Sequence, residues 1–346
     1  MPANLSPEYK AAADAYRKAR DPQEKLDHLR EMLSVIPKHK GTDHLQADLK
    51  HRIKELDEEL AGPKRGGARS GPALVIRPEG AAQVALVGPP NSGKSLLHSR
   101  LTGSSAKSGP YPHTTQYPEP GMLRWEDVLF QFIDLPAISP QHPLPWLGST
   151  LQSADACLLV IDLADPECLQ QVASVQAMLL ERKVSLVTEW PAGAAQAPAA
   201  VATVEEEGDV FVLRLPTLLL ANKSDLLAHP ETDLEALAEL EEPHFPTLLV
   251  SAETGQGLGA LGEWLWRSFG LVRIYTKAPG KPALHDRPFT LRHGEQTVGD
   301  VARLVHRDMA QTLKYARVWG ASVAADGQHV GRDHVLVDRD VVELHA

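Results

Sequence analysis

The chain has 346 residues, a net charge of −10 at pH 7, 43% hydrophobic residues and 23% charged residues. These values are typical of a soluble globular protein with two or three domains. No apolar run approaches the length of a membrane span and the polar N-terminus lacks a signal-peptide pattern, so we expect a cytoplasmic chain that makes no membrane contact. The two cysteines, Cys157 and Cys168, exclude a disulfide framework and match no metal-ligand spacing.

The first 62 residues have the periodicity of helices. Apolar residues recur at helical spacing over residues 6–34 and again over residues 42–60, with a break at Pro37–Gly41 between them. This pattern predicts a helical hairpin over residues 1–62. A stretch rich in glycine and proline follows, and we interpret residues 63–80 as a linker.

Residues 81–271 contain short apolar runs that each end at a polar motif. Continuous apolar strands separated by helical stretches predict an α/β fold, with a mainly parallel sheet covered by helices on both faces. Sheets of this kind bind ligands at the carboxyl ends of their strands. The motifs at the ends of the runs are therefore expected to meet at one edge. The runs end at Val87, Ile133, Ile161, Ala221 and Val250.

The first of these motifs matches the phosphate-binding P-loop, GxxxxGK[ST], in full. The pattern lies between a predicted strand and a predicted helix, where its amide groups and the helix N-terminus can bind phosphates. Lys94 is expected to reach the β- and γ-phosphates, and the Ser95 hydroxyl to bind Mg²⁺. The residues of the loop are Gly88, Pro89, Pro90, Asn91, Ser92, Gly93, Lys94 and Ser95.

A second motif selects the base. The Asp225 carboxylate can accept two hydrogen bonds from guanine, an arrangement that adenine does not offer. Asn222 is expected to brace the P-loop, and the stem of Lys223 to lie along the face of the base. Downstream, the tripeptide Ser251, Ala252 and Glu253 suits a backbone contact to the guanine oxygen.

Two switch segments are predicted between these motifs. Thr114 and Thr115 lie in one loop, and one of them is expected to complete the Mg²⁺ shell when a γ-phosphate is present. Asp134 ends a predicted strand, and Ala137 follows at a position where an amide contacts the γ-phosphate. Glycine usually occupies the Ala137 position, and the next residue, Ile138, lacks the polar group that orients water in many GTPases. We therefore expect Lys94, Thr115 and Asp134 to support only slow hydrolysis.

The last segment, residues 272–346, has a different pattern. Residues 272–276 alternate as a strand, Thr297 can cap a helix that runs to Leu313, and residues 335–337 and 341–344 are predicted short strands. One helix among several short strands predicts a small α+β module.

Together, these motifs resemble those of the Obg/DRG GTPases, that is, the developmentally regulated GTP-binding proteins and their bacterial relatives. The resemblance covers most of the chain, and residues 272–346 resemble a TGS domain, a β-grasp module. In that family the second threonine, here Thr115, is the magnesium ligand, and a hydrophobic residue takes the position of Ile138. Asn91 departs from the serine common in close relatives. It either helps to bind K⁺ beside the phosphates, as in a subset of GTPases, or bonds within the loop.

The resemblance implies a GTP/GDP switch that acts near ribosomes or RNA, through the helical region and the TGS domain. The basic triplet Lys38–Lys40 and the run from Lys314 to Trp319 are the candidate contacts, although we expect Tyr315 or Trp319 to pack into the core of its module. A GTP-binding scaffold or sensor with little or no hydrolysis is the alternative, favoured by Ala137 and Ile138.

Overall fold

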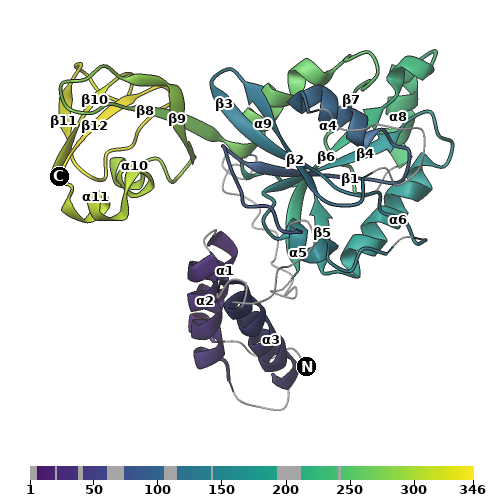
Figure 1. Cartoon of the computed structure of the whole chain (residues 1–346), viewed down its shortest axis with the longest axis horizontal. Helices are drawn as coiled ribbons and strands as arrows, with labels where there is room; N and C mark the ends of the chain where they lie inside the picture. Colours follow the sequence, from purple (N-terminus) through teal and green to yellow (C-terminus); the bar gives the residue numbers. More distant parts are fainter. Residues whose placement is uncertain are drawn as a thin grey trace, which may run out of the picture. The chain divides into compact units, whose positions relative to one another are not determined.

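The computed structural model describes most of the chain in two compact units, Met1–Pro72 and Ala73–Ala346 (Figure 1). The described residues are 6–19, 22–37, 42–60, 74–104, 115–141, 143–192, 212–240 and 243–346. The predicted site residue Thr114 and the triplet Lys38–Lys40 lie outside these ranges. Among the described residues, no helix combines the length and apolar character needed to cross a bilayer.

The described part of the N-terminal unit contains three helices where the sequence predicted two. They are α1 (Pro7–Lys18), α2 (Pro22–Val35) and α3 (Asp43–Leu60). The predicted single helix over residues 6–34 is wrong because Pro22 lacks an amide hydrogen and disfavours helical backbone in the residue before it. Accordingly, α1 ends at Lys18, and the backbone of its C-cap residue, Ala19, is extended (ψ 133°). Tyr9, Leu29 and Leu49, one from each helix, are fully buried and form the core of this unit.

The second unit begins with the predicted mainly parallel sheet. Its strand order is β2-β3-β1-β4-β6-β5, with β7 also paired to β6. All pairings are parallel except that of β2 with β3, which is antiparallel and places β2 at the edge. The strands are β1 (Gln83–Val87), β2 (Glu119–Trp125), β3 (Val128–Asp134), β4 (Ala156–Asp162), β5 (Val184–Val187), β6 (Leu213–Asn222) and β7 (Thr247–Leu249).

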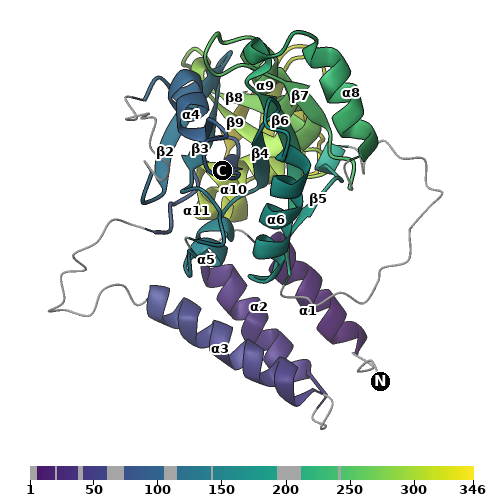
Figure 2. The ribbon, with the colours of Figure 1, turned by 90° about the vertical axis from the view of Figure 1, so that its right-hand side faces the viewer.

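Helices cover both faces of this sheet (Figure 2). On one face, α4 (Lys94–Thr102) and α9 (Leu261–Phe269) contribute Leu97, Leu265 and Phe269 to a buried apolar cluster. On the other face, a second cluster joins α5 (Leu147–Leu151), α6 (Cys168–Leu180) and α8 (Pro230–Leu240) to the strands. This two-faced burial explains why the strands are continuously apolar in sequence.

Residues 272–346, called here the C-terminal module, form a second sheet of order β11-β10-β12-β8-β9. One face packs on α10, where Val298 and Val301 join the buried cluster of the module. The elements are β8 (Leu271–Thr276), β9 (Leu284–Arg292), α10 (Val298–Val305), α11 (Arg307–Thr312), β10 (Tyr315–Trp319), β11 (Gln328–Val330) and β12 (Val341–His345).

Three sequence predictions for this module are wrong in detail. The helix that begins after Thr297 does not run unbroken to Leu313, because His306 adopts an extended backbone (φ −167°, ψ 140°) and its side chain caps α11. Residues 335–337 form only an isolated bridge, between Val335 and Thr297, and no strand. Neither Tyr315 nor Trp319 belongs to the apolar cluster of the module. Both lie half-buried on the sheet face opposite α10.

Candidate nucleotide-binding site

The P-loop connects β1 to α4 and leaves the start of that helix open. Gly93 is the N-cap residue in a left-handed conformation (φ 89°), no side chain caps the helix, and its first turn contains no acidic residue. The first amide groups and the positive end of the helix dipole are therefore available to an anion. A side chain at Gly88 (φ 155°) or at Gly93 would overlap the Val160 carbonyl or the Asn222 amide, respectively. Both positions require glycine.

Lys94, the first residue of α4, is buried against the loop. Its ammonium group donates hydrogen bonds to the Gly88 and Pro89 carbonyl oxygens at 3.2 and 3.0 Å. Burial lowers its pKa to about 8, while the nearby Asp134 carboxylate acts in the opposite direction. Lys94 is thus held over the loop by weak acceptors, in a place where a phosphate would provide stronger ones.

Three oxygen-bearing side chains meet beside the P-loop. The Thr115 hydroxyl lies 2.9 Å from both the Ser95 hydroxyl and one Asp134 carboxylate oxygen. The other oxygen of Asp134, Oδ1, is buried and has no hydrogen-bond partner among the described residues. Hard oxygen ligands suit Mg²⁺, and an unpartnered buried carboxylate oxygen favours a cation. The residues therefore fit the magnesium site that the sequence predicted.

The segment after Asp134 is tied to the P-loop by its backbone. The Ile138 amide donates to the Gly88 carbonyl oxygen at 3.0 Å, and the Ala137 side chain is 8% exposed. Ile138 points into the apolar cluster on the α6 face of the sheet, away from the phosphate loop. No side chain from position 138 is available to orient water, as the sequence indicated.

On the base side, Asn222 joins three loops. Its amide nitrogen donates to the Ser92 carbonyl at 2.8 Å, and its amide oxygen accepts from the Ala252 backbone at 2.9 Å. The Ser251 hydroxyl donates to one carboxylate oxygen of Asp225, and the carboxylate can still accept further hydrogen bonds from a ligand. The structure thus brings Asn222, Asp225, Ser251 and Ala252 together at the carboxyl ends of β6 and β7, as the motif order predicted.

Lys223 and Glu253 are held by residues that the sequence did not single out. The Lys223 ammonium pairs with Asp162 at 2.6 Å, which fixes its stem across the end of β4. Arg100 on α4 donates to the Glu253 carbonyl oxygen at 2.6 Å. Asp162 follows an apolar run and could have been found by that signal, whereas Arg100 has no sequence signal beyond its place on a helix.

Asn91 lies at the tip of the P-loop with its side chain exposed. It adopts a left-handed backbone (φ 61°), a region that asparagine tolerates better than most residues. Its side chain makes no hydrogen bond to any residue that the structure describes. Hydrogen bonding within the described part of the loop therefore does not explain why asparagine occupies position 91. K⁺ binding remains as one explanation, and the left-handed backbone, which asparagine tolerates, is a new one.

Two family models match the chain. Residues 83–189 match the model described as 50S ribosome-binding GTPase, and residues 272–346 match the TGS domain. An uncharacterised GTP-binding protein of Halobacterium salinarum is 28% identical, over 94% of this chain and 99% of its own length. A GTP-binding protein of Methanocaldococcus jannaschii is 29% identical, over 93% and 92% respectively.

A plant protein is a further sequence relative. Developmentally-regulated G-protein 3 of Arabidopsis thaliana is 27% identical, over 93% of this chain and 98% of its own length. The crystal structure of a GTP-binding protein from Pyrococcus horikoshii is 15% identical, with a TM-score of 0.49, and covers 76% of this chain and 99% of the other. The chain is therefore a GTP-binding protein like the developmentally regulated G-proteins, with a P-loop GTPase domain and a C-terminal TGS domain.

Proposed function

We propose that the chain hydrolyses GTP to GDP and phosphate at a slow intrinsic rate, and that it works in the cytoplasm as a switch on a ribosomal or RNA partner. The observation that supports this most is the meeting of Ser95, Thr115 and Asp134 beside an uncapped helix N-terminus. In this proposal, Asp225 and Asn222 select guanine, and Lys94 contacts the phosphates.

Hydrolysis adds water across the bond between the β–γ bridging oxygen and the γ-phosphorus. Mg²⁺ held by Ser95 and Thr115 would supply charge stabilisation on the phosphates. Lys94 would leave its two loop carbonyls for the phosphate oxygens, and amides of the P-loop and of Ala137 would donate to the charge that develops on the γ-phosphoryl group. Ile138 contributes no polar group to orient the attacking water, so the intrinsic rate is low in this proposal.

A GTP-binding scaffold or sensor with little or no hydrolysis is the second candidate. The buried Ala137 and Ile138 favour it, because the segment that normally moves with the γ-phosphate is here anchored by an apolar side chain in the core. Single-turnover hydrolysis of labelled GTP, with and without ribosomes, separates the two. Product in either condition supports the enzyme, and no product in both conditions refutes it.

Asn91 supports a further proposal, that K⁺ stimulates hydrolysis. The amide is exposed and free of described partners at the tip of the phosphate loop, where an ion could use its oxygen. The Asn91→Gly variant keeps access to the left-handed backbone and removes the amide. We expect faster turnover in KCl than in NaCl for the wild-type chain and no difference for the variant. Equal wild-type rates in the two salts would refute K⁺ use.

The RNA proposal rests on the sheet face of the C-terminal module opposite α10. There the Tyr315 ring lies stacked between the rings of His329 and His345, with centroids 4.6 and 4.5 Å away. Arg317 donates to His329 at 2.9 Å. Because both faces of Tyr315 are already covered, this surface offers cations and ring edges to phosphates, rather than an open ring to a base.

Charge reversal tests this surface. The Arg317→Glu variant should weaken co-sedimentation with ribosomal subunits and lessen its dependence on salt. Arg303→Glu on α10, an exposed arginine on the other face of the module, is the matched control. Equal binding by wild type and Arg317→Glu would remove this face from the proposal.

A further inference from the structure

The β2–β3 hairpin joins the two predicted switch segments to a distant turn. Thr115 lies four residues before β2, and Asp134 is the last residue of β3. The two strands pair without a break from Glu119–Asp134 at one end to Trp125–Val128 at the other. Seven paired residues span about 20 Å. The hairpin therefore has the nucleotide site at one end and the turn Glu126–Asp127 at the other.

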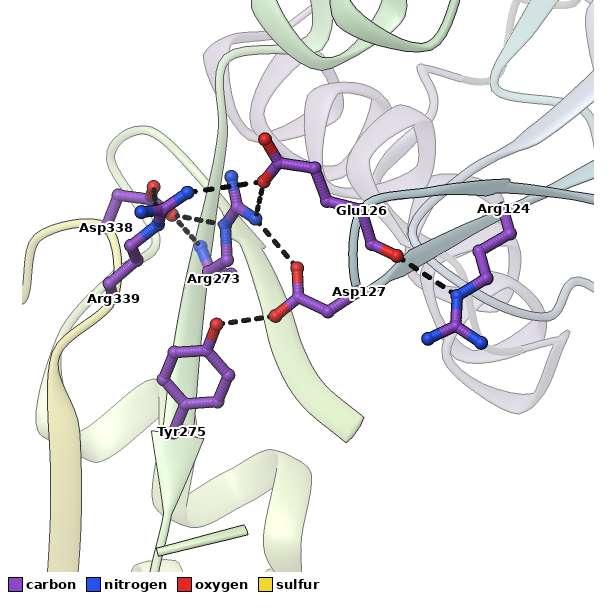
Figure 3. A network of polar contacts seen from close by, with 7 residues as sticks. All are labelled: Arg124, Glu126, Asp127, Arg273, Tyr275, Asp338 and Arg339. Carbon is purple, nitrogen blue, oxygen red and sulfur yellow. Dashed lines mark hydrogen bonds and ion pairs between the residues drawn. The ribbon is translucent and has the colours of Figure 1, made fainter. Parts of the chain in front are cut away.

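That turn is bound by the C-terminal module (Figure 3). The Arg273 guanidinium, on β8, donates to the Glu126 carboxylate at 2.5 Å and to the Asp127 carboxylate at 2.7 Å. The Tyr275 hydroxyl, two residues along the same strand face, donates to the other Asp127 oxygen. Arg339, in the turn before β12, donates to Glu126 at 3.3 Å. The side chains of both turn residues, Glu126 and Asp127, are thus hydrogen-bonded by residues of the module.

Arg273 is the centre of this contact. Its side chain is 4% exposed, and it also donates to Asp338 at 3.0 Å within the module. Burial opposes its charge, but the hydrogen bonds to Glu126 and Asp127 outweigh that effect and raise its pKa. The charge is therefore retained, and Arg273 holds the hairpin turn and the β12 turn in one arrangement.

Aromatic side chains make the contact close-packed. The Arg273 guanidinium lies 4.5 Å from the Trp266 ring and 5.4 Å from the Trp125 ring, and the two rings are 5.4 Å apart. Trp125 lies so close to Gly262 on α9 that a methyl group there would overlap its ring. A shift of the hairpin along its own axis would therefore displace Trp125 from Gly262 and Arg273 from its carboxylates.

Glu126 shows that the turn is held at a cost in local conformation. It adopts φ 51° in a two-residue hairpin loop, where glycine or asparagine is favoured. A glutamate persists in such a conformation when its surroundings over-determine it. Here its carboxylate accepts hydrogen bonds from Arg273 and Arg339, and its carbonyl oxygen accepts one from Arg124 at 3.1 Å.

From these contacts we propose that the β2–β3 hairpin couples the nucleotide site to the C-terminal module, with Arg273 as the positioning residue. When a γ-phosphate draws Thr115 and Asp134 to new positions, the paired strands transmit the change to the turn, and Arg273 and Tyr275 pass it to the β12 turn of the module. By linkage, a ligand on the module changes the relative affinity for GTP and GDP. This proposal rests on the proposed switch function, and it identifies the hairpin as the path between the nucleotide site and the C-terminal module.

The test compares affinities for GDP and for a non-hydrolysable GTP analogue in three variants. Arg273→Lys keeps the charge but loses the planar fork whose Nη1 reaches the turn while Nε reaches Asp338. Tyr275→Phe removes a single hydroxyl. Arg267→Lys is the matched control, because Arg267 lies on α9 in an exposed ion pair with Glu263. We expect the ratio of the two affinities to change about fivefold or more in the first two variants and not in the control.

Hydrogen exchange at residues 338–340 provides a readout that stability alone does not move. In the wild-type chain their protection should differ between the GDP and GTP-analogue states, and in Tyr275→Phe this difference should shrink. Unchanged affinity ratios in both junction variants, or equal protection in both wild-type states, would overturn the coupling and leave the switch intact. A wild-type chain that binds neither nucleotide would overturn the proposed function itself.

Discussion

Replacing Asn222 with alanine tests the base side of the site without a nucleotide. The Asn222 side chain is buried and makes two hydrogen bonds, to the Ser92 carbonyl and from the Ala252 amide. The Asn222→Ala variant leaves both backbone groups buried without a partner, at a cost of about 1–3 kcal/mol each. A total near 3 kcal/mol should lower the melting temperature of a unit of this size by about 6–12 °C.

Tryptophan fluorescence is a suitable assay, because all six tryptophans lie in the unit Ala73–Ala346. Ser224→Ala is the matched control. Its hydroxyl is buried two residues away and has no hydrogen-bond partner among the described residues, so its removal should change the free energy of unfolding little. The role of Asn222 in bracing the loops would be refuted if the free energy of unfolding of Asn222→Ala stayed within about 0.5 kcal/mol of the wild-type value. It would also be refuted if Ser224→Ala were equally destabilised.

Four further predictions concern Lys94 and the binding of nucleotides. Burial lowers the Lys94 pKa to about 8 in the free chain, whereas bound phosphates favour the charged form, so GTP affinity should fall as pH rises above 8. Calorimetry in two buffers should detect the proton that is taken up on binding. The Lys94→Arg variant should show no such fall in affinity between pH 7 and 9. The unliganded fold should instead gain stability between pH 8 and the ordinary lysine pKa of 10.5, because the unfolded chain binds the extra proton. The Gly93→Ala variant should abolish nucleotide binding, because the added methyl group overlaps the Asn222 amide. The Gly103→Ala variant, at the far end of α4 with open space around it, should still bind. Equal binding by the two variants would show that the contact with Asn222 does not make glycine necessary at position 93. The Asp225→Asn variant should lose about 100-fold or more in GTP affinity and gain affinity for xanthosine triphosphate. The reason is that the new amide can accept the Ser251 hydrogen bond through its oxygen and present an N–H donor to the base. Competition between the two nucleotides measures both changes.

The parts of the fold that were predictable are those where local pattern and tertiary role agree. The run before Gly88 is apolar because β1 is covered on both faces, and the glycines that follow are required by positive φ and close backbone approach. Motifs at the ends of β3, β6 and β7 meet because parallel strands align their carboxyl ends. Sequence order therefore predicted which motifs meet at one edge of the sheet, and the roles of their residues stay predictions.

The missed elements lack such agreement. β2 contains Pro120 and Gly121 and has no apolar alternation, so only its pairing with β3 makes it a strand. Gly121 is there because His98 and Thr102 on α4 leave no room for a methyl group, a constraint that arises between elements far apart in sequence. The break between α1 and α2 was signalled by Pro22 and could have been predicted from the sequence.

The long-range ion pairs had no sequence signal at all, and this bears on how the molecule would switch. Arg273 alternates with Val272 and Ile274 as any strand residue would, and its role appears only when Glu126 and Asp127 are brought to it from about 146 residues earlier in the chain. Burial alone acts to raise the Asp127 pKa, yet hydrogen bonds from Tyr275 and Arg273 hold it below its usual value. The carboxylate is thus charged through the neutral pH range. A junction built on charges that persist at neutral pH responds to position rather than to proton concentration, which is what a hairpin driven by a γ-phosphate requires.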